Sequence, residues 1–351
     1  MRNKTFNYEM NILRGIAIFL VVFGHATFKE NFTNNISGTS LLQWSVEFIY
    51  TFHMPLFFFI SGFFAYKLFE IRNINEYYTF VKYKFIKLII PYLTFSIAGT
   101  IIKLLLSSIA NNPVNLKYVF IDILLYPWNN PLKLLWFIYT LFIIFMLLPL
   151  FNRINNKIKL IILGLLWILP FSYGEIFNFN GVIRYSFWFI LGYEFFKTYD
   201  KYLKYEHKYK ALLAIVSTGL LFIININPIQ TGVFINIFEM VCSFLAILSL
   251  VNLVHIINIK SKICIFLNVL GKYSMDIYLL HWFLQMPIRL LWDKLHFNYY
   301  IMFSLALMLA FLSIPISKYI IRKYKFFSYI AYGVDYSKKS EVSSQYIKNV
   351  S

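Results

Sequence analysis

The sequence predicts an all-α membrane protein that crosses the bilayer about ten times. Of its 351 residues, 60% are hydrophobic and only 14% are charged, and the mean hydropathy is +0.65. A soluble core could not hide this much apolar surface, so lipid must solvate the remainder. The formal net charge is +18, but the basic residues lie between apolar runs and form no continuous stripe. This pattern argues against nucleic acid as a partner.

Ten apolar runs approach the roughly 20 residues that a helix needs to cross hydrocarbon. They cover residues 12–28, 41–66, 85–106, 132–151, 158–172, 181–196, 211–226, 232–257, 265–291 and 299–321. The stretch at residues 119–126 is too short to cross, and Pro127 and Pro131 follow it. We therefore expect an interfacial segment there.

The distribution of basic residues predicts the orientation of the ten spans. With the N-terminus in the cytoplasm, the cytoplasmic segments hold 25 of the 33 Lys and Arg residues, as the positive-inside rule requires. We therefore expect both termini in the cytoplasm, a transmembrane domain over residues 1–331 and a disordered polar tail over residues 332–351. A cleaved signal peptide is not expected, because Arg14 and His25 interrupt the first apolar run and no small-x-small site follows it.

Ionisable side chains inside the spans are candidates for function, because burying them in a bilayer is costly. They are Arg14, His25, Glu47, His53, Arg184, Glu194, Glu239, Asp276 and His281. At about 100° per residue, Arg14 and His25 share one helix face and lie roughly 16 Å apart along the axis. The cation suits a phosphate or thioester ligand, and the imidazole suits removal of a hydroxyl proton. The alternatives are a snorkelling topology anchor for Arg14 and an interhelical hydrogen bond for His25.

The second span contains a helix break beside His53. Pro55 removes a backbone hydrogen bond and frees a carbonyl near Thr51, which then needs another partner. Ser61-Gly62 permits close approach of another helix or of a substrate, and helix packing is the simpler explanation. His53 itself suits either a chemical or a packing role.

Lys84 and Lys87 are three residues apart, so they share a helix face at the expected cytoplasmic surface. They could bind a polyphosphate or contact anionic lipid head groups. Cys242 and Cys264 are the two cysteines, and neither a CxxC motif nor a Cys/His spacing is present. The sequence therefore supports neither a disulfide scaffold nor a metal site.

Several blocks of sequence resemble the type-3 membrane acyltransferase family, especially its fucose 4-O-acetylase-like branch. The most specific are Arg14-Gly15 with His25, and the run at residues 53–62. Weaker matches lie at residues 135–138, 187–193 and 270–281, and the likeness extends over about residues 5–325. The sequence departs from the family where Lys84 and Lys87 stand in place of two Arg, and where Asn11 stands in place of an acid.

The resemblance implies an enzyme of the plasma membrane that takes an acyl group, usually acetyl, from a cytoplasmic acyl-coenzyme A such as acetyl-CoA. The acceptor would be a hydroxyl of a cell-envelope glycan or a lipid-linked sugar. By the same resemblance Arg14 and His25 are essential, and Arg14, Lys84 and Lys87 bind the phosphates of the donor. His25 would act as general base or accept the acyl group itself. His53 or His281 would polarise the thioester carbonyl.

Two other functions fit parts of the sequence. A transporter or flippase for an envelope lipid or sugar would also carry intramembrane charges and Pro-broken spans, although its expected inverted repeat is not visible. The unrelated membrane-bound O-acyltransferases also use an intramembrane His. The spacing of Arg14 and His25 close to the N-terminus favours the type-3 family. A purely structural anchor would leave the polar residues unexplained.

Overall fold

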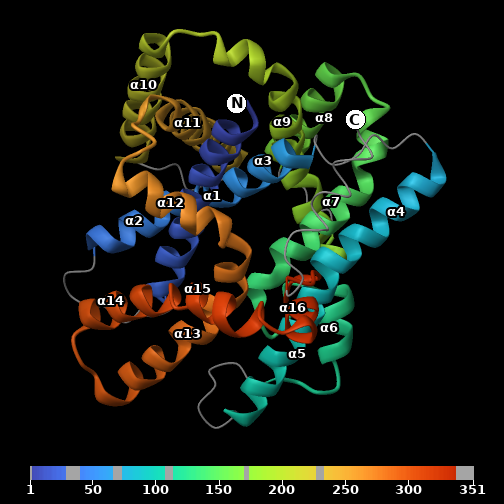
Figure 1. Cartoon of the computed structure of the whole chain (residues 1–351), viewed down its shortest axis with the longest axis vertical. Coiled ribbons are helices and arrows are strands. Elements are labelled where there is room, and N and C mark those ends of the chain that lie inside the picture. The colour runs from blue at the N-terminus through green and yellow to red at the C-terminus, as the bar shows by residue number, and fades with distance from the viewer. Residues whose placement is uncertain are drawn as a thin grey trace.

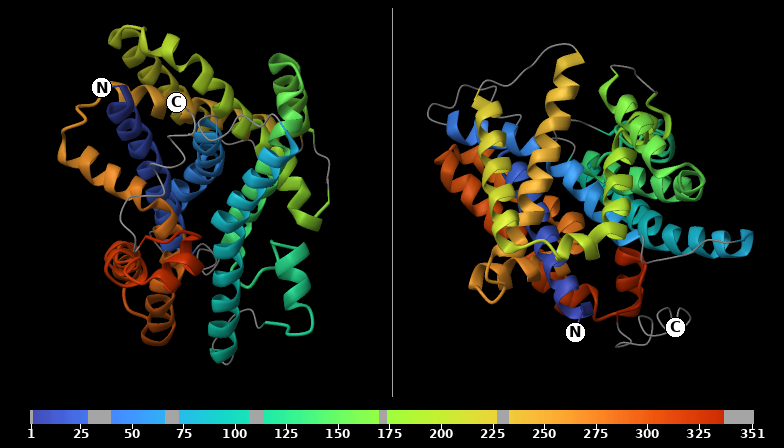
Figure 2. Two further views of the ribbon diagram at one scale, coloured as in Figure 1. Left: turned by 45° about the vertical axis from the view of Figure 1, so that its right-hand side comes forward. Right: turned by 90° about the horizontal axis from the view of Figure 1, so that it is seen from above.

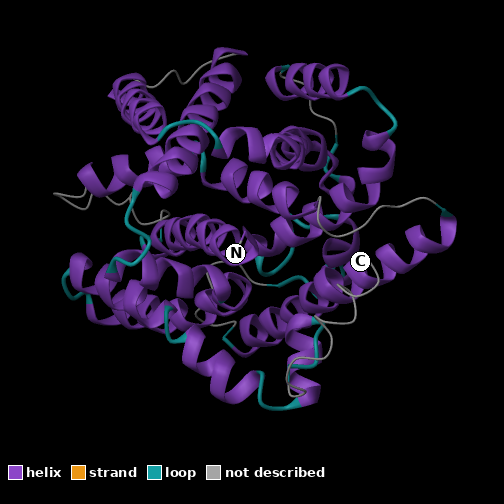
Figure 3. Cartoon of the chain, turned by 45° about the horizontal axis from the view of Figure 1, so that its top comes forward, coloured by secondary structure: helices purple, strands orange, loops and turns teal. Residues whose placement is uncertain are grey.

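The structure is a computed structural model that describes residues 2–28, 40–65, 73–106, 114–169, 174–226 and 233–336. Over these ranges the chain forms helices, turns and loops but no strands (Figures 1 and 3). Seven helices are long and apolar enough to cross a membrane, or up to eight if one bent pair counts as a span. The chain is therefore an all-α polytopic membrane protein. The number of ten spans and the cytoplasmic position of both termini stay predictions, and residues 337–351 of the expected tail lie outside the described residues.

The described helices are labelled as in Figure 1. They are α1 (Arg2–Ala26), α2 (Ser40–Tyr50), α3 (His53–Ala65), α4 (Ile74–Lys84), η2 (Phe85–Ile89), α5 (Ile90–Leu105), α6 (Val119–Leu125), η3 (Lys133–Leu135), α7 (Trp136–Asn152), α8 (Asn156–Ile168), η4 (Ile176–Asn178), α9 (Phe179–Leu203), α10 (His207–Ile226), α11 (Val233–Ile256), α12 (Lys262–Lys272), α13 (Ser274–Leu295), α14 (Tyr299–Ala310), α15 (Ser313–Ile316), η5 (Ser317–Ile321) and α16 (Lys325–Tyr332).

Most of the expected spans coincide with these helices. The seven long apolar helices match the expected spans one to four, seven, eight and ten. The third is the longest, because α4, the π-helical η2 and α5 continue as one rod (Figure 2). The fifth and sixth expected spans fall on α8 and α9. At 13 residues α8 is too short to cross alone, and the 25 residues of α9 include Arg184, Glu194 and Lys197.

The ninth expected span is not one helix. It consists of α12 and α13, which meet at an angle of 83°. Tyr273 joins them with non-helical backbone angles (φ −102°, ψ 15°). α12 packs along α1, and α13 turns away from it to cross the end of α1 and pack on α14 (Figure 1). The expected span over residues 265–291 is therefore a bent pair of helices, a turn on which apolarity alone carries no information.

The second span breaks where Pro55 predicts. α2 ends at Tyr50 and α3 begins at His53, with a turn between them. The carbonyl of Thr51 accepts a hydrogen bond from Ser243 Oγ of α11 at 2.8 Å. The freed carbonyl thus finds a protein partner, as a membrane interior demands.

Paired glycines bring α3 and α9 into backbone contact. A Cβ on Gly62 would lie 1.8 Å from the carbonyl oxygen of Phe189, and a Cβ on Gly192 would lie 1.9 Å from that of Phe59. Only glycine fits at either position, as at other close crossings of membrane helices. The packing explanation of Ser61-Gly62 is therefore confirmed.

The contact between α1 and α12 repeats this arrangement. A Cβ on Gly15 would lie 1.9 Å from the carbonyl oxygen of Leu267, and a Cβ on Gly271 would lie 1.8 Å from the carbonyl oxygen of Asn11. Because Gly15 follows Arg14, the crossing fixes the height and rotation of the helix that carries the candidate site.

Candidate active site

α1 carries both Arg14 and His25. It runs without interruption from Arg2 to Ala26, so the two side chains share a face of one helix, and both are half-buried. The guanidinium carbon of Arg14 lies 3.8 Å from the centre of the Phe64 ring on α3. This cation–π contact, worth about 0.5–2 kcal/mol, orients the arginine.

Two lysines from the third span join Arg14. The ammonium of Lys84 lies 3.2 Å from the centre of the Phe145 ring, and its charge interacts with those of Arg14 and Lys87. Lys84 is only 5% exposed. The sequence predicts a surface position for it, but its ammonium lies among the aromatic rings of Phe80 and Tyr83 on α4 and Phe145 on α7.

These three cations are Arg14 of α1, Lys84 at the end of α4 and Lys87 in η2, which continues α4. We call them the α1–α4 cation group. None of them has an acidic partner among the described residues. A buried charge without a counterion is costly. The group therefore produces a positive potential that favours binding of an anion.

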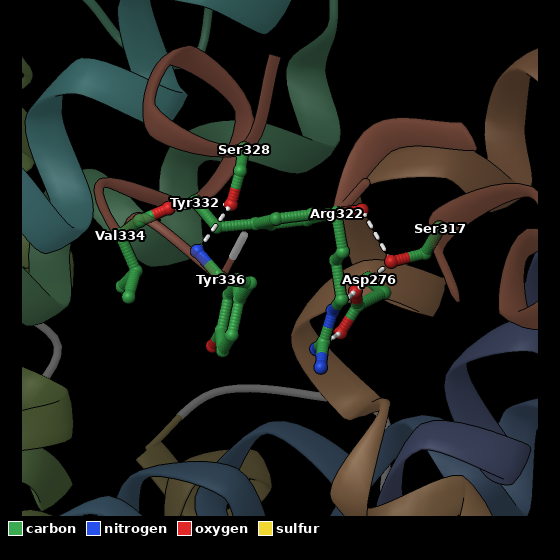
Figure 4. Close-up of polar contacts among 7 residues, drawn as sticks. All are labelled: Asp276, Ser317, Arg322, Ser328, Tyr332, Val334 and Tyr336. Carbon is green, nitrogen blue, oxygen red and sulfur yellow. Dashed lines mark hydrogen bonds and ion pairs between the residues drawn. The ribbon is translucent and has the colours of Figure 1, made fainter. Parts of the chain in front are cut away.

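A neighbouring cation, Arg322, is neutralised. Its Nη2 and Nε lie 2.8 and 3.0 Å from the two carboxylate oxygens of Asp276 (Figure 4). Ser317 Oγ donates to the same carboxylate, and the Tyr332 hydroxyl donates to Ser317 Oγ at 2.9 Å. Burial raises the pKa of the Tyr332 phenol, which keeps it a neutral donor. The ring of Tyr336 lies 4.1 Å from the guanidinium carbon. Asp276 thus has a structural role.

Other ionisable residues of the spans are also accounted for. Glu194 binds the buried Lys159 at 2.7 Å and Lys197 at 2.9 Å. Glu47 accepts from Gln43 at an exposed face of α2, and Glu239 interacts electrostatically with Arg184. Each of these three carboxylates thus interacts with a residue outside the α1–α4 cation group.

Three histidines from three helices gather at the other end of α1. The rings of His25 and His281 have centroids 5.3 Å apart. His53 interacts electrostatically with His25, and its ring lies 4.8 Å from that of Tyr50, which packs on Gly24. The bend before α13 and the break before α3 place His281 and His53 here.

Backbone carbonyls fix the tautomers of two of these rings. His281 Nδ1 donates to the carbonyls of Ile277 at 2.9 Å and Tyr278 at 2.8 Å, and His53 Nδ1 donates to that of Ile49 at 3.1 Å. Since a carbonyl only accepts, Nε2 of each neutral ring carries a lone pair. His281 Nε2 is buried and has no partner among the described residues, a state that costs about 1–3 kcal/mol.

Gln285 on α13 is a further polar residue, which is not ionisable and so was not among the candidates predicted from the sequence. Its Nε2 donates to the carbonyl of Val22 at 3.2 Å, and its Oε1 is buried with no partner within the described part of the chain. Four residues further along, Arg289 lies 5.4 Å from the ring of Phe28 at the end of α1. His281, Gln285 and Arg289 follow one another at intervals of four residues, a polar stripe on an apolar helix that would have revealed them.

The predicted residues thus form two groups at the two ends of α1. Arg14, Lys84 and Lys87 form one group, and His25 lies beside His53 and His281 in the other. Neither group lines the cavity of about 700 Å³ between α9, α10 and α11. Within the described ranges no cluster of three His, Cys, Asp or Glu residues could hold a metal ion, and Cys242 and Cys264 are free and buried.

Comparison with known proteins identifies the family. A family model described as an acyltransferase domain matches residues 7–322, nearly the whole chain. No curated protein and no solved structure matches it. The chain belongs to this type-3 acyltransferase family and is a membrane acyltransferase.

Proposed function

We propose that the protein is an O-acetyltransferase of the plasma membrane. It transfers an acetyl group from cytoplasmic acetyl-CoA to a hydroxyl of a cell-envelope glycan or a lipid-linked sugar. The observation that carries this proposal is the α1–α4 cation group, which lacks acidic partners among the described residues and whose Arg14 lies on the helix that also carries His25.

The cation group suits the donor. Coenzyme A carries a pyrophosphate and a 3′-phosphate, whose charges match those of Arg14, Lys84 and Lys87. Arg14 offers a planar fork for two phosphate oxygens, whereas the lysines act as point charges. The thioester would then extend along α1 towards His25, roughly 16 Å further along the helix axis.

His25 provides the chemistry in this proposal. As general base it takes the proton of the acceptor hydroxyl while the oxygen attacks the thioester carbonyl, and the coenzyme A thiolate leaves and recovers a proton. Such catalysis contributes about 10²–10⁴ in rate. Alternatively, His25 accepts the acyl group first and passes it to the hydroxyl.

The tautomers of His53 and His281 change the role expected for them. With Nδ1–H bound to a carbonyl, Nε2 accepts a hydrogen bond and does not donate one. In its neutral form neither ring can then donate a hydrogen bond to a thioester carbonyl. We place both beside the acceptor hydroxyl, where a lone pair is useful.

Purified protein incubated with radiolabelled acetyl-CoA and candidate envelope glycans tests the proposal. We expect transfer or hydrolysis that His25→Ala abolishes, while His207→Ala, at an exposed position of α10, retains it. Normal activity in a His25→Ala protein of native stability would contradict the assignment.

The bent pair α12–α13 and the broken α2–α3 span favour one alternative function, a transporter or flippase for an envelope lipid or sugar. That protein would move its substrate in vesicles without acyl-CoA. The incubation distinguishes the two functions, because only an acyltransferase consumes the thioester in a His25-dependent reaction.

A further inference from the structure

Two buried hydrogen-bond acceptors on α13 have no donor. His281 is 0% and Gln285 is 1% exposed. The other polar atoms of both side chains are engaged with backbone carbonyls, so the orientation of each group is fixed. What remains is His281 Nε2 and Gln285 Oε1, both unpartnered among the described residues. Buried polar groups are nearly always paired, so two exceptions on neighbouring turns of one helix need a physical explanation.

The two acceptors occupy one place in the fold. Residues four apart lie on the same face of a helix, with a rise of about 6 Å between them. Both side chains meet the last turns of α1, where His281 contacts the His25 ring and Gln285 binds the carbonyl of Val22. His25, beside them, is half-buried.

We propose that His281 Nε2 and Gln285 Oε1 form the acceptor subsite, which binds a polyol through two of its hydroxyl groups. This inference rests on the proposed function and adds to it two residues that bind the acceptor. Each hydroxyl donates its proton to one of the two acceptors. A third hydroxyl of the same molecule then lies next to His25 and is the one that becomes acylated.

The charges around the subsite favour a neutral donor of hydrogen bonds. An ammonium group would also satisfy two acceptors, but it would need a counterion, and Asp293, the acid one turn beyond Arg289, already pairs with Arg289 at 3.9 Å. No acidic side chain among the described residues pairs with His25, His281 or Gln285. A carbohydrate hydroxyl supplies the missing proton without bringing a charge.

Histidine NMR tests the subsite directly. The protein contains six histidines, so ¹⁵N-histidine labelling in lipid nanodiscs gives a spectrum that single His substitutions can assign. The probe is methyl α-glucopyranoside, and its permethylated form, which has no hydroxyl donors, is the control. We expect the Nε2 resonance of His281 to move saturably with the glycoside and to stay fixed with the control.

Two further controls isolate the subsite. His255 also has a buried nitrogen without a partner in the described residues, Nδ1, but its Nε2 lies 2.9 Å from the Tyr199 hydroxyl near the start of α1. Its resonances should not respond. Gln285→Met should weaken the glycoside affinity at least about tenfold, whereas Gln43→Met, at an exposed position of α2, should leave it unchanged.

Two results would overturn the inference. One is a His281 Nε2 resonance that does not respond to the glycoside, including one that is already hydrogen-bonded to water. The other is an equal response to the permethylated probe. Because acetyl-CoA is absent from this experiment, either result leaves the proposed acyl transfer intact. Conversely, a protein that binds the glycoside but never consumes the thioester would refute only the proposed function.

Discussion

Arg322 and the α1–α4 cation group lie close together in this protein and differ in whether an acid neutralises them. Arg322 is held by both oxygens of Asp276 and enclosed by tyrosines. Arg14, Lys84 and Lys87 have no acid among the described residues, although Lys87 is close enough to Arg322 for their charges to interact. The fold can thus neutralise a cation in this region, yet it leaves three without counterions.

The difference separates structural charges from functional ones. A neutralised cation contributes to the fold, and removing its partner leaves a partly buried charge without a counterion. A cation without a counterion costs free energy in the empty protein, and a bound anion recovers it. Removing the counterion of a neutralised cation should therefore lower the stability of the empty protein, whereas removing a cation that has no counterion should leave that stability unchanged or raise it.

The largest expected effect is on the neutralised pair. Asp276→Asn removes the counterion of Arg322, and since the Arg322 side chain is 22% exposed, we expect a loss of about 2–4 kcal/mol in unfolding free energy. Glu206→Gln, in an exposed pair with Lys208, should cost less than about 0.5 kcal/mol. Denaturant unfolding in detergent measures both, and equal effects would refute the structural role of Asp276.

Lys84→Met should affect the stability of the empty protein in the opposite direction. It replaces a buried cation with an apolar side chain of similar length, so the empty protein should be as stable or more stable. Coenzyme A should bind about 10–100-fold more weakly, because a hydrogen bond to a charged group contributes about 1.5–3 kcal/mol. Lys84→Arg, which keeps the charge, should restore most of the affinity. A large loss of stability in Lys84→Met would show that an undetected partner neutralises this lysine.

A smaller effect is expected at Tyr332. Tyr332→Phe removes one donor to Ser317 and should cost about 1 kcal/mol. Burial raises the pKa of this phenol, so above the usual tyrosine pKa of about 10 the unfolded chain loses its proton first. The wild type should therefore lose stability as the pH rises past about 10, and Tyr332→Phe should lose less. Identical alkaline profiles would contradict the buried, neutral phenol.

The smallest effect should come from Lys197→Gln. Its side chain is 32% exposed, and Lys159 continues to neutralise Glu194. We expect a change within about 0.5 kcal/mol and no change in the affinity for coenzyme A. A clear loss of affinity would extend the binding region beyond the α1–α4 cation group.

The sequence was sufficient for the fold class and for much of the candidate site. The apolar runs located most of the spans, and Pro55 located the break whose carbonyl Ser243 now satisfies. The spacing of Arg14 and His25 placed them on one helix face, because helix periodicity is a local property. Long-range packing was beyond the sequence. It could not reveal the 83° turn at Tyr273, and therefore it could not reveal that His281 meets His25. Nor could it reveal that Lys84 is buried against Phe145.

Titration calorimetry of coenzyme A tests the central claim most directly. Wild-type protein is compared with Arg14→Met/Lys84→Met protein at low and at moderate ionic strength. We predict that the wild type binds, that salt weakens its binding, and that the double variant loses both the affinity and most of the salt dependence while remaining folded. Equal affinities for the two proteins would contradict the assignment of these cations to the donor phosphates.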